Sequence, residues 1–109
     1  MYKNINNQRI YFHNFENIDV NKKSLLFIPG AGLDYRYVRS LRFDGIMFNP
    51  PLVIDFPGHG KSEGKGFKSI EEYSLFMIDA LEDWDFNDLY IFGHSMGGLI
   101  GLDLINKLK

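Results

Sequence analysis

The chain has 109 residues, 45% of them hydrophobic and 16% aromatic, which is enough apolar material for the core of one small domain. Its formal net charge of -2 comes from scattered acids and bases, with no basic stripe for nucleic acid and no polybasic cluster for a membrane surface. The absence of cysteine excludes disulfide bonds and thiolate metal sites, and apolar runs such as 25–28 are too short to cross a bilayer. We therefore expect a cytoplasmic protein that acts on a small molecule or binds protein, with no cofactor, no metal and no integral membrane segment.

The first predicted element in chain order is a β-hairpin. Hydrophobic and polar residues alternate over 9–13, and the turn-prone pair Asn6-Asn7 precedes them. Three continuous apolar runs follow at 24–28, 52–55 and 89–92, and each ends in a glycine or proline-glycine turn. Continuous runs indicate strands that are covered on both faces, which is typical of a parallel sheet.

Three helices are predicted around these runs. The strongest extends from Ser69 to Asp85, with Ser69 and Glu72 as a capping box, and a weaker one extends from Asp34 to Phe43 with its arginines on a solvated face. The last extends from Met96 to Leu108 and is expected to be buried through Leu99, Ile100, Leu104, Ile105 and Leu108. The order β, β, β, α, β, α, β, α predicts an α/β fold, in which a hairpin is followed by a mostly parallel sheet with flanking helices.

The segment Gly93-His94-Ser95-Met96-Gly97 joins the third apolar run to the last helix. A serine in a strained strand-to-helix turn needs neighbours without side chains, and Gly93 and Gly97 meet this need while the Ser95 hydroxyl projects above the sheet. The first N–H groups of the helix then lie where negative charge develops on an attacked carbonyl. Gly98 is expected to allow close approach of helix and strand. The pattern predicts a nucleophile elbow, and its alternative is a glycine-rich turn in which Ser95 only caps the helix.

Two further glycine-rich loops follow the first and second apolar runs. In Ile28-Pro29-Gly30-Ala31-Gly32 the glycines let the backbone approach a ligand, so the N–H of Ala31 would form an oxyanion hole with that of Met96. An ordinary glycine-rich turn is the alternative there. The second loop, 55–62, is expected to be structural, with Asp55 and His59 satisfying backbone groups near the rim of the site.

The three segments Ile-Pro-Gly-Ala-Gly, Asp-Phe-Pro-Gly-His-Gly-Lys-Ser and Gly-His-Ser-Met-Gly-Gly stand in the order and approximate spacing of the α/β-hydrolase superfamily. From about Ile10 to its last residue the chain resembles that superfamily, most closely its esterase, monoacylglycerol lipase and lysophospholipase branch. The resemblance implies a nucleophile at Ser95 and an oxyanion hole at Ala31 and Met96. The residues that it implies in support are Gly30, Gly93, His94, Gly97 and Gly98. Pro29 departs from the family, which usually has histidine there, and the change concerns loop geometry more than chemistry.

The family's triad runs along the chain as Ser, then Asp or Glu, then His. After Ser95 the only acid is Asp103, eight residues along the helix and therefore about 12 Å down its axis, and there is no histidine. His13, His59 and His94 all precede the nucleophile. His59 is the best placed of them, but its strand is expected two positions from the elbow strand, about 9.6 Å away. We therefore expect neither the triad acid nor the base within this chain.

Residues 1–109 are accordingly interpreted as a partial α/β-hydrolase domain, from the first strand through the nucleophile helix, with the C-terminal half absent. The expected function is that of a serine hydrolase acting on carboxylic esters, lipids or thioesters through an acyl-enzyme on Ser95. It is expected to be inactive without a complementing C-terminal segment or self-association. The alternative is a truncated or pseudoenzyme module that binds protein through the open edge of its sheet. Carbon-bond chemistry on the same fold also stays open.

Overall fold

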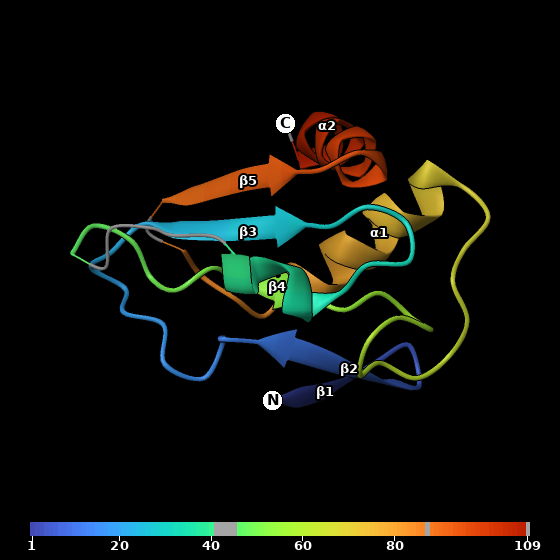
Figure 1. Ribbon diagram of the computed structural model, residues 1–109, viewed down its shortest axis with the longest axis horizontal. Helices are drawn as coiled ribbons and strands as arrows, with labels where there is room; N and C mark the ends of the chain where they lie inside the picture. Colours follow the sequence, from blue (N-terminus) through green and yellow to red (C-terminus); the bar gives the residue numbers. More distant parts are fainter. Residues whose placement is uncertain (41–45, 87, 109) are drawn as a thin grey trace.

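The chain alternates strands and helices after an N-terminal hairpin, as the computed structural model shows for residues 1–40, 46–86 and 88–108 (Figure 1). The strands are β1 (Tyr2–Ile5), β2 (Gln8–His13), β3 (Ser24–Ile28), β4 (Val53–Ile54) and β5 (Leu89–Gly93). The helices are the 3₁₀ helix η1 (Tyr35–Ser40), α1 (Ile70–Leu81) and α2 (Met96–Leu108). Their order in the chain is the predicted one, so the α/β fold is confirmed.

The hairpin of β1 and β2 is closed by a two-residue turn. The strands pair antiparallel up to Ile5 and Gln8, and the two residues between them, Asn6 and Asn7, have φ angles of 52° and 66°. Two successive left-handed residues form the turn that matches the twist of a hairpin, and asparagine tolerates this conformation better than most residues. The Asn6-Asn7 turn is therefore confirmed.

The strands pair in two groups, β1-β2-β4 and β3-β5, which lie side by side so that the order across the whole sheet is β1, β2, β4, β3, β5 (Figure 1). β2 pairs antiparallel with β4, and β3 pairs parallel with β5 from Ser24 and Leu89 to Ile28 and Gly93. A parallel bridge between Leu26 and Leu52 joins β3 to the β4 segment. Because β3, β4 and β5 point the same way, their carboxyl ends and all three glycine-rich loops lie at one edge of the sheet.

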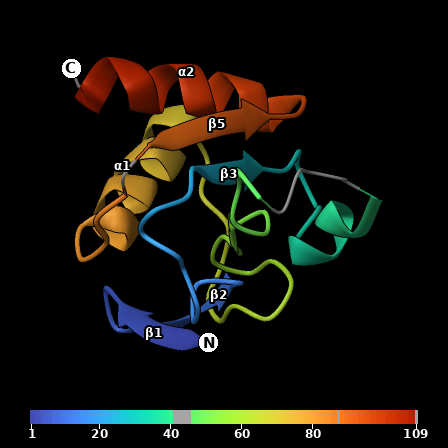
Figure 2. The same cartoon turned by 90° about the vertical axis from the view of Figure 1, so that its left-hand side faces the viewer.

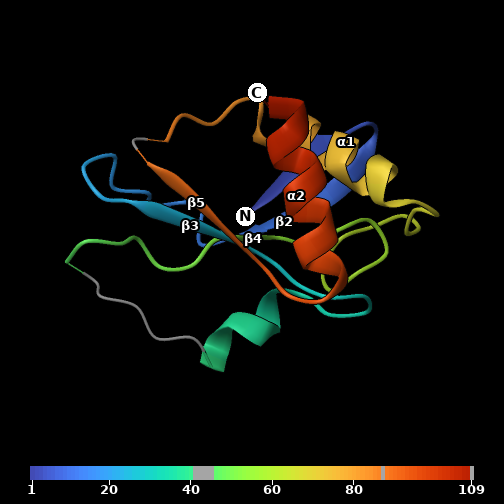
Figure 3. The same cartoon turned by 90° about the horizontal axis from the view of Figure 1, so that it is seen from above.

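Helices lie on both faces of the sheet around β3 (Figures 2 and 3). Figures 2 and 3 show α1 and α2 on one face of the sheet and η1 on the other. All five residues of β3 are buried, as its continuous apolar run predicts. The larger core cluster includes Leu26, Ile28, Met77, Ile100 and Leu104, and a smaller one beneath η1 joins Phe27, Val38 and Val53.

Helix α1 has its predicted start but ends earlier than predicted. Ser69 Oγ accepts the N–H of Glu72 at 3.1 Å and donates to the Glu72 carboxylate at 3.1 Å, which confirms the cap. The helix stops at Leu81 instead of Asp85. The residues after it are acidic, and negative charge at a helix C-terminus opposes the helix dipole. Trp84 leaves the helix to pack edge-on against Phe15, with ring centroids 4.9 Å apart.

The weaker predicted helix is a 3₁₀ helix in the structure. η1 follows Asp34, whose carboxylate accepts the N–H of Arg36 at 3.0 Å. Arg36 and Arg39 are exposed, as expected for a solvated face. Arg42 and Phe43, at the end of the predicted helix, lie outside the described residues.

Helix α2 is buried on one side only, which corrects the prediction of a buried helix. Ile100 and Leu104 are fully buried against α1 and the sheet, but Leu99, Ile105 and Leu108 are 59%, 42% and 57% exposed. The reason is that the described strands and helices reach only one side of α2, since β5 is the last strand of the sheet. None of the helices in the described ranges is long and apolar enough to cross a membrane.

Candidate active site

Ser95 stands at the junction of β5 and α2 with a backbone that serine seldom adopts. Its φ is 58°, in the left-handed region, and the residue is exposed at the carboxyl edge of the sheet. The N–H of Gly98 donates to the Ser95 carbonyl at 2.9 Å, and the N–H of His94 donates to the carbonyl of Ile28 at 3.1 Å. Hydrogen bonds on both sides thus hold Ser95 in a strained strand-to-helix turn, as the elbow predicted for residues 93–97 requires.

Glycines around Ser95 are required by close backbone approach. A Cβ at Gly97 would overlap the carbonyl oxygen of Ile28, and one at Gly93 would overlap the backbone of Gly97. At Gly30 a Cβ would come within 3.3 Å of the Ser95 Cβ, so this glycine brings the loop after β3 against the elbow.

Gly98 does not have the role expected of it. A Cβ there would lie 3.6 Å from the Gly93 carbonyl oxygen, which is an ordinary contact. The close approach is made instead by Gly97 and by Gly101, where a Cβ would lie 3.2 Å from Ile91 Cγ2. The physical reason is helical periodicity, since Gly97 and Gly101 are four residues apart and share the face that touches the sheet, and both are buried.

Two backbone N–H groups beside Ser95 are available to a ligand. Ala31 follows Gly30 in the loop after β3, and Met96 is the first residue of α2. Within the described ranges no hydrogen bond uses the N–H of either residue. Both residues line one cavity of about 310 Å³, which extends away from the elbow between the loop after β4 and the start of α1.

The three histidines have other partners. His13 Nδ1 lies 2.9 Å from the Tyr11 hydroxyl in the hairpin, and the His94 ring stacks on Tyr37 with centroids 5.5 Å apart. His59 lines the cavity, and its Nδ1 lies 3.0 Å from the Pro57 carbonyl oxygen. In the part of the chain that the structure describes, none of them hydrogen-bonds to Ser95, so no serine–histidine pair is assembled there.

The acid that follows Ser95 in the sequence is engaged elsewhere. Asp103 lies on α2, and its Oδ2 is 3.4 Å from Lys107 Nζ one turn further on. This ion pair between residues i and i+4 is an ordinary feature of a helix surface.

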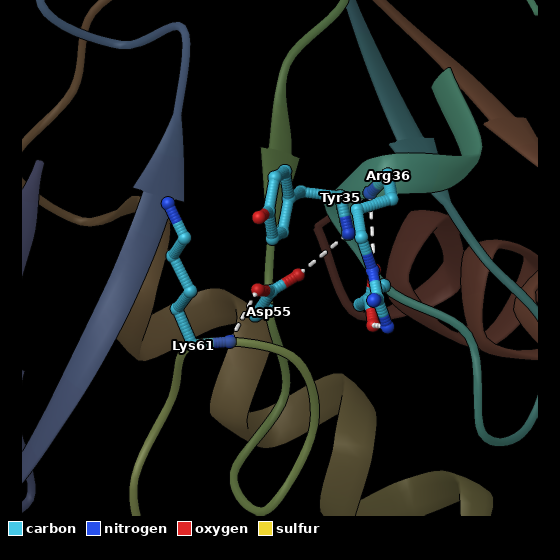
Figure 4. Close-up of polar contacts among 5 residues, drawn as sticks. Tyr35, Arg36, Asp55 and Lys61 are labelled. Atoms are coloured by element: carbon cyan, nitrogen blue, oxygen red, sulfur yellow. Dashed lines mark hydrogen bonds and ion pairs between the residues drawn. The ribbon is translucent and has the colours of Figure 1, made fainter. Parts of the chain in front are cut away.

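Asp55 joins the two loops that flank the elbow (Figure 4). It is buried at the end of β4, where Oδ1 accepts the N–H of Tyr35 at 2.8 Å and Oδ2 accepts the N–H of Lys61 at 3.0 Å. Tyr35 follows the loop that holds Ala31, and Lys61 belongs to the loop that holds His59. Asp55 therefore fixes these loops relative to each other, and its expected structural role and that of His59 are both seen.

The residues around Asp55 make further contacts that the sequence did not indicate. Lys61 Nζ lies over the rings of Tyr11 and Tyr35, 4.8 Å and 4.9 Å from their centroids. The buried Asp34 carboxylate pairs with the Arg36 guanidinium at 2.9 Å and 2.7 Å, and this partner lowers the pKa of Asp34. Burial has the opposite effect at Asp55, where it raises the pKa of the carboxyl.

Comparison with known proteins places this arrangement in a family. The sequence profile of the alpha/beta hydrolase family matches residues 25–108. The chain is similar to a 2-succinyl-6-hydroxy-2,4-cyclohexadiene-1-carboxylate synthase of Photorhabdus laumondii, with 35% identity over 54 residues, which are 50% of this chain and 19% of that protein. A synthase of the same name from an Enterobacter species is 32% identical over 53 residues, or 49% of this chain and 20% of that protein.

Solved structures resemble the chain over nearly its whole length. A protein of Thermoplasma acidophilum described as a predicted CIB-like hydrolase matches 98% of this chain and 55% of its own, with a TM-score of 0.78 and 20% identity. Est1E of Butyrivibrio proteoclasticus, solved with ferulic acid bound, matches 99% of this chain and 47% of its own, with a TM-score of 0.73 and 24% identity. At these low sequence identities the similarity shows a common fold and nothing about activity.

Because the family profile matches most of the chain, residues 25–108, the chain belongs to the alpha/beta hydrolase family. The chain spans about half the length of the two solved structures, and its aligned segments cover about a fifth of the two synthases.

Replacing Gly97 by alanine tests whether the elbow depends on close backbone approach. The added Cβ has no space beside the Ile28 carbonyl, and we expect Gly97→Ala to lower the free energy of unfolding by about 3 kcal/mol or more. Gly98→Ala is the matched control, because an alanine fits there and should stabilise the helix by up to about 1 kcal/mol. Urea denaturation followed by circular dichroism measures both. Equal effects of the two substitutions would contradict the packing.

The raised pKa of Asp55 gives the free energy of unfolding a pH dependence. Between the ordinary value of 3.8 and the folded pKa, the folded chain holds a proton that the unfolded chain lacks. This carboxyl therefore adds stability as the pH falls through its folded pKa, and the gain levels off below 3.8.

Urea denaturation of the wild-type chain and of Asp55→Asn over a pH series isolates this contribution, because Asp34 and the other carboxyls are common to both. At neutral pH we expect Asp55→Asn to cost about 1 to 3 kcal/mol, since its amide NH₂ cannot accept one of the two N–H groups. The difference, wild type minus variant, should rise as the pH falls from 7 toward 4. A difference that falls or stays constant would be inconsistent with a raised pKa.

Proposed function

We propose that this chain provides the nucleophile and the oxyanion hole of a serine hydrolase that acts on carboxylic esters, lipids or thioesters. The observation that carries the proposal is the strained Ser95, with φ at 58° and its turn enclosed by Gly93, Gly97 and Gly30. A left-handed serine at an exposed strand-to-helix junction has a steric cost, and such strain is retained where a reactive group must be presented. The unpaired N–H groups of Ala31 and Met96 support the same proposal.

In the proposed reaction Ser95 Oγ attacks the acyl carbon while its proton passes to a general base. The N–H groups of Ala31 and Met96 stabilise the negative oxygen of the tetrahedral intermediate, and the leaving alcohol or thiol takes up the proton. Water then attacks the acyl-enzyme and releases the acid, which restores the serine. Each preorganised donor is worth about 3 kcal/mol or more in transition-state stabilisation in enzymes of this kind.

The general base and the triad acid are proposed to come from residues beyond these 109, in a complementing C-terminal segment or another chain. Two surfaces support this part of the proposal. In the described part of the chain, β5 has a strand on only one side, and Tyr90 and Phe92 are 43% and 48% exposed on it. The outer side of α2 exposes Leu99 and Leu102 at 59% and 65%. Residues 1–109 are on this proposal a partial domain, and the cytoplasm is its proposed location.

A second candidate function comes from the two synthases. Both are named for making 2-succinyl-6-hydroxy-2,4-cyclohexadiene-1-carboxylate and not for hydrolysing an ester. On this alternative Ser95 and its neighbours serve the making or breaking of carbon bonds. The third candidate, a non-catalytic module that binds protein, is favoured by the open edge of β5 and by the lack of a serine–histidine pair among the described residues.

Covalent labelling with a fluorophosphonate separates the two candidates that use Ser95 from the non-catalytic module. If Ser95 is a presented nucleophile, the folded chain should become phosphonylated at Ser95, as located by peptide mass spectrometry, and Ser95→Ala should remove the label. The heat-denatured chain is the control, because it keeps all its serines but loses the elbow. Adding the C-terminal half of the domain should accelerate labelling if that half brings the base. If Ser95 is labelled no faster than in the denatured chain, whether or not the C-terminal half is added, the proposed nucleophile is rejected and the non-catalytic module is favoured.

A further inference from the structure

The cavity beside the candidate oxyanion hole has an uneven distribution of charge. Its lining comprises Ala31 and Met96 at one end and the aromatic and aliphatic side chains of Phe67, Ile70 and Tyr73. Lys68, His59 and Ser69 complete the set, so a lysine and a histidine line the cavity and no carboxylate does. Other hollows of the described chain include acids, namely Asp79 with Glu82, Asp34, and Glu72 with Asp79.

Lys68 is not neutralised by the acids closest to it in sequence. Glu72 accepts the hydroxyl of Ser69 at 3.1 Å, and Glu71 lies 3.6 Å from Lys107 Nζ. Lys68 itself has no ion pair or hydrogen bond with another described residue. The positive end of the α1 dipole lies at the same wall, since Ile70 is the first residue of that twelve-residue helix.

The rest of the wall is rigid. The Tyr73 hydroxyl accepts the N–H of Phe67 at 3.1 Å, and the two rings meet edge to face with centroids 5.0 Å apart. Tyr73 is buried, with its ring also packed against Phe56 at 4.7 Å. A volume of about 310 Å³ is at the small end of the range for ligand pockets, so a short acyl group fits better than a long lipid chain.

We propose that this cavity receives a short acyl group that ends in a carboxylate, such as the acyl part of a dicarboxylic acid monoester. The scissile carbonyl lies at the Ala31 and Met96 end, the methylene chain lies along Phe67 and Tyr73, and the terminal carboxylate lies beside Lys68. This inference rests on the proposed function, because it takes the Ala31 and Met96 end as the place of the reacting carbonyl. It narrows the substrates to anionic acyl groups.

Two small ketones that have no ester bond to break provide the test. They are 4-oxopentanoate, which bears a carboxylate, and 4-oxopentanamide, which is neutral and of nearly the same shape. Their binding to the full chain is followed by the ¹H–¹⁵N shifts of Ala31 and Met96. We expect the anion to bind roughly fivefold more tightly, because one partly solvated ion pair is worth about 1 kcal/mol. The preference should shrink as the ionic strength rises, because Lys68 is exposed.

Lys68→Met should remove the preference, because it should weaken the binding of 4-oxopentanoate much more than that of 4-oxopentanamide. Lys65→Met is the matched control, because Lys65 is exposed on the same loop and is not part of the cavity lining. Thermal melts should show both variants folded. Equal binding of the two ketones, a preference that survives Lys68→Met, or no binding of either at millimolar concentration would overturn the proposal.

The ketone-binding test and the Ser95 labelling test can fail independently of each other. Labelling of Ser95 without a preference for the anion would reject the anionic acyl group and keep the hydrolase. Selective binding of 4-oxopentanoate through Lys68, with Ser95 labelled no faster than in the denatured chain whether or not the C-terminal half is added, would keep the anion site and reject the nucleophile.

Discussion

The start of α2 lies so close to the carboxyl end of β3 that a methyl group at Gly97 would overlap the carbonyl of Ile28. Much of the proposed site depends on this contact. It places the first N–H of α2 at the edge of the sheet, and together with the pairing of β3 and β5 it confines the turn in which Ser95 has its left-handed backbone. The left-handed serine thus stands where a helix and a strand are in close contact.

The same edge of the sheet is held by a second constraint, the buried carboxylate of Asp55. A carboxylate away from water is costly unless its oxygens accept hydrogen bonds, and here the two acceptors are used by backbone N–H groups from different loops. One of those loops holds Ala31 and the other holds His59. The position of one candidate oxyanion donor is therefore coupled, through Tyr35, to a residue that does not touch the cavity.

The sequence predicted those parts of the fold that have a local cause. The Asn6-Asn7 turn, the Ser69 cap and the buried strand of residues 24–28 each follow from residue types over a few positions, and all are present. The end of α1 was missed because Trp84 lies outside the helix and packs against Phe15. Phe15 is 69 positions earlier in the chain, so no local pattern identifies this contact. The exposure of Leu99 and Ile105 was missed because an amphipathic pattern shows that a side is apolar and not whether anything covers it. The role assigned to Gly98 was wrong for a related reason, since only the packed helix shows that Gly97 and Gly101 face the sheet. The roles of Ser95, Ala31 and Met96 stay predictions, to which the structure adds a strained φ and two unpaired N–H groups.

The central claim is that the N–H groups of Ala31 and Met96 converge on an oxygen bound at Ser95. The most direct measurement is the ¹H–¹⁵N spectrum of the chain after phosphonylation, because the phosphonyl oxygen then stands where the negative oxygen of the intermediate would be. The amide protons of Ala31 and Met96 should move downfield together as they form charge-assisted hydrogen bonds, while that of Gly32 should move little. An adduct at Ser95 that leaves both amide protons unshifted would contradict the account.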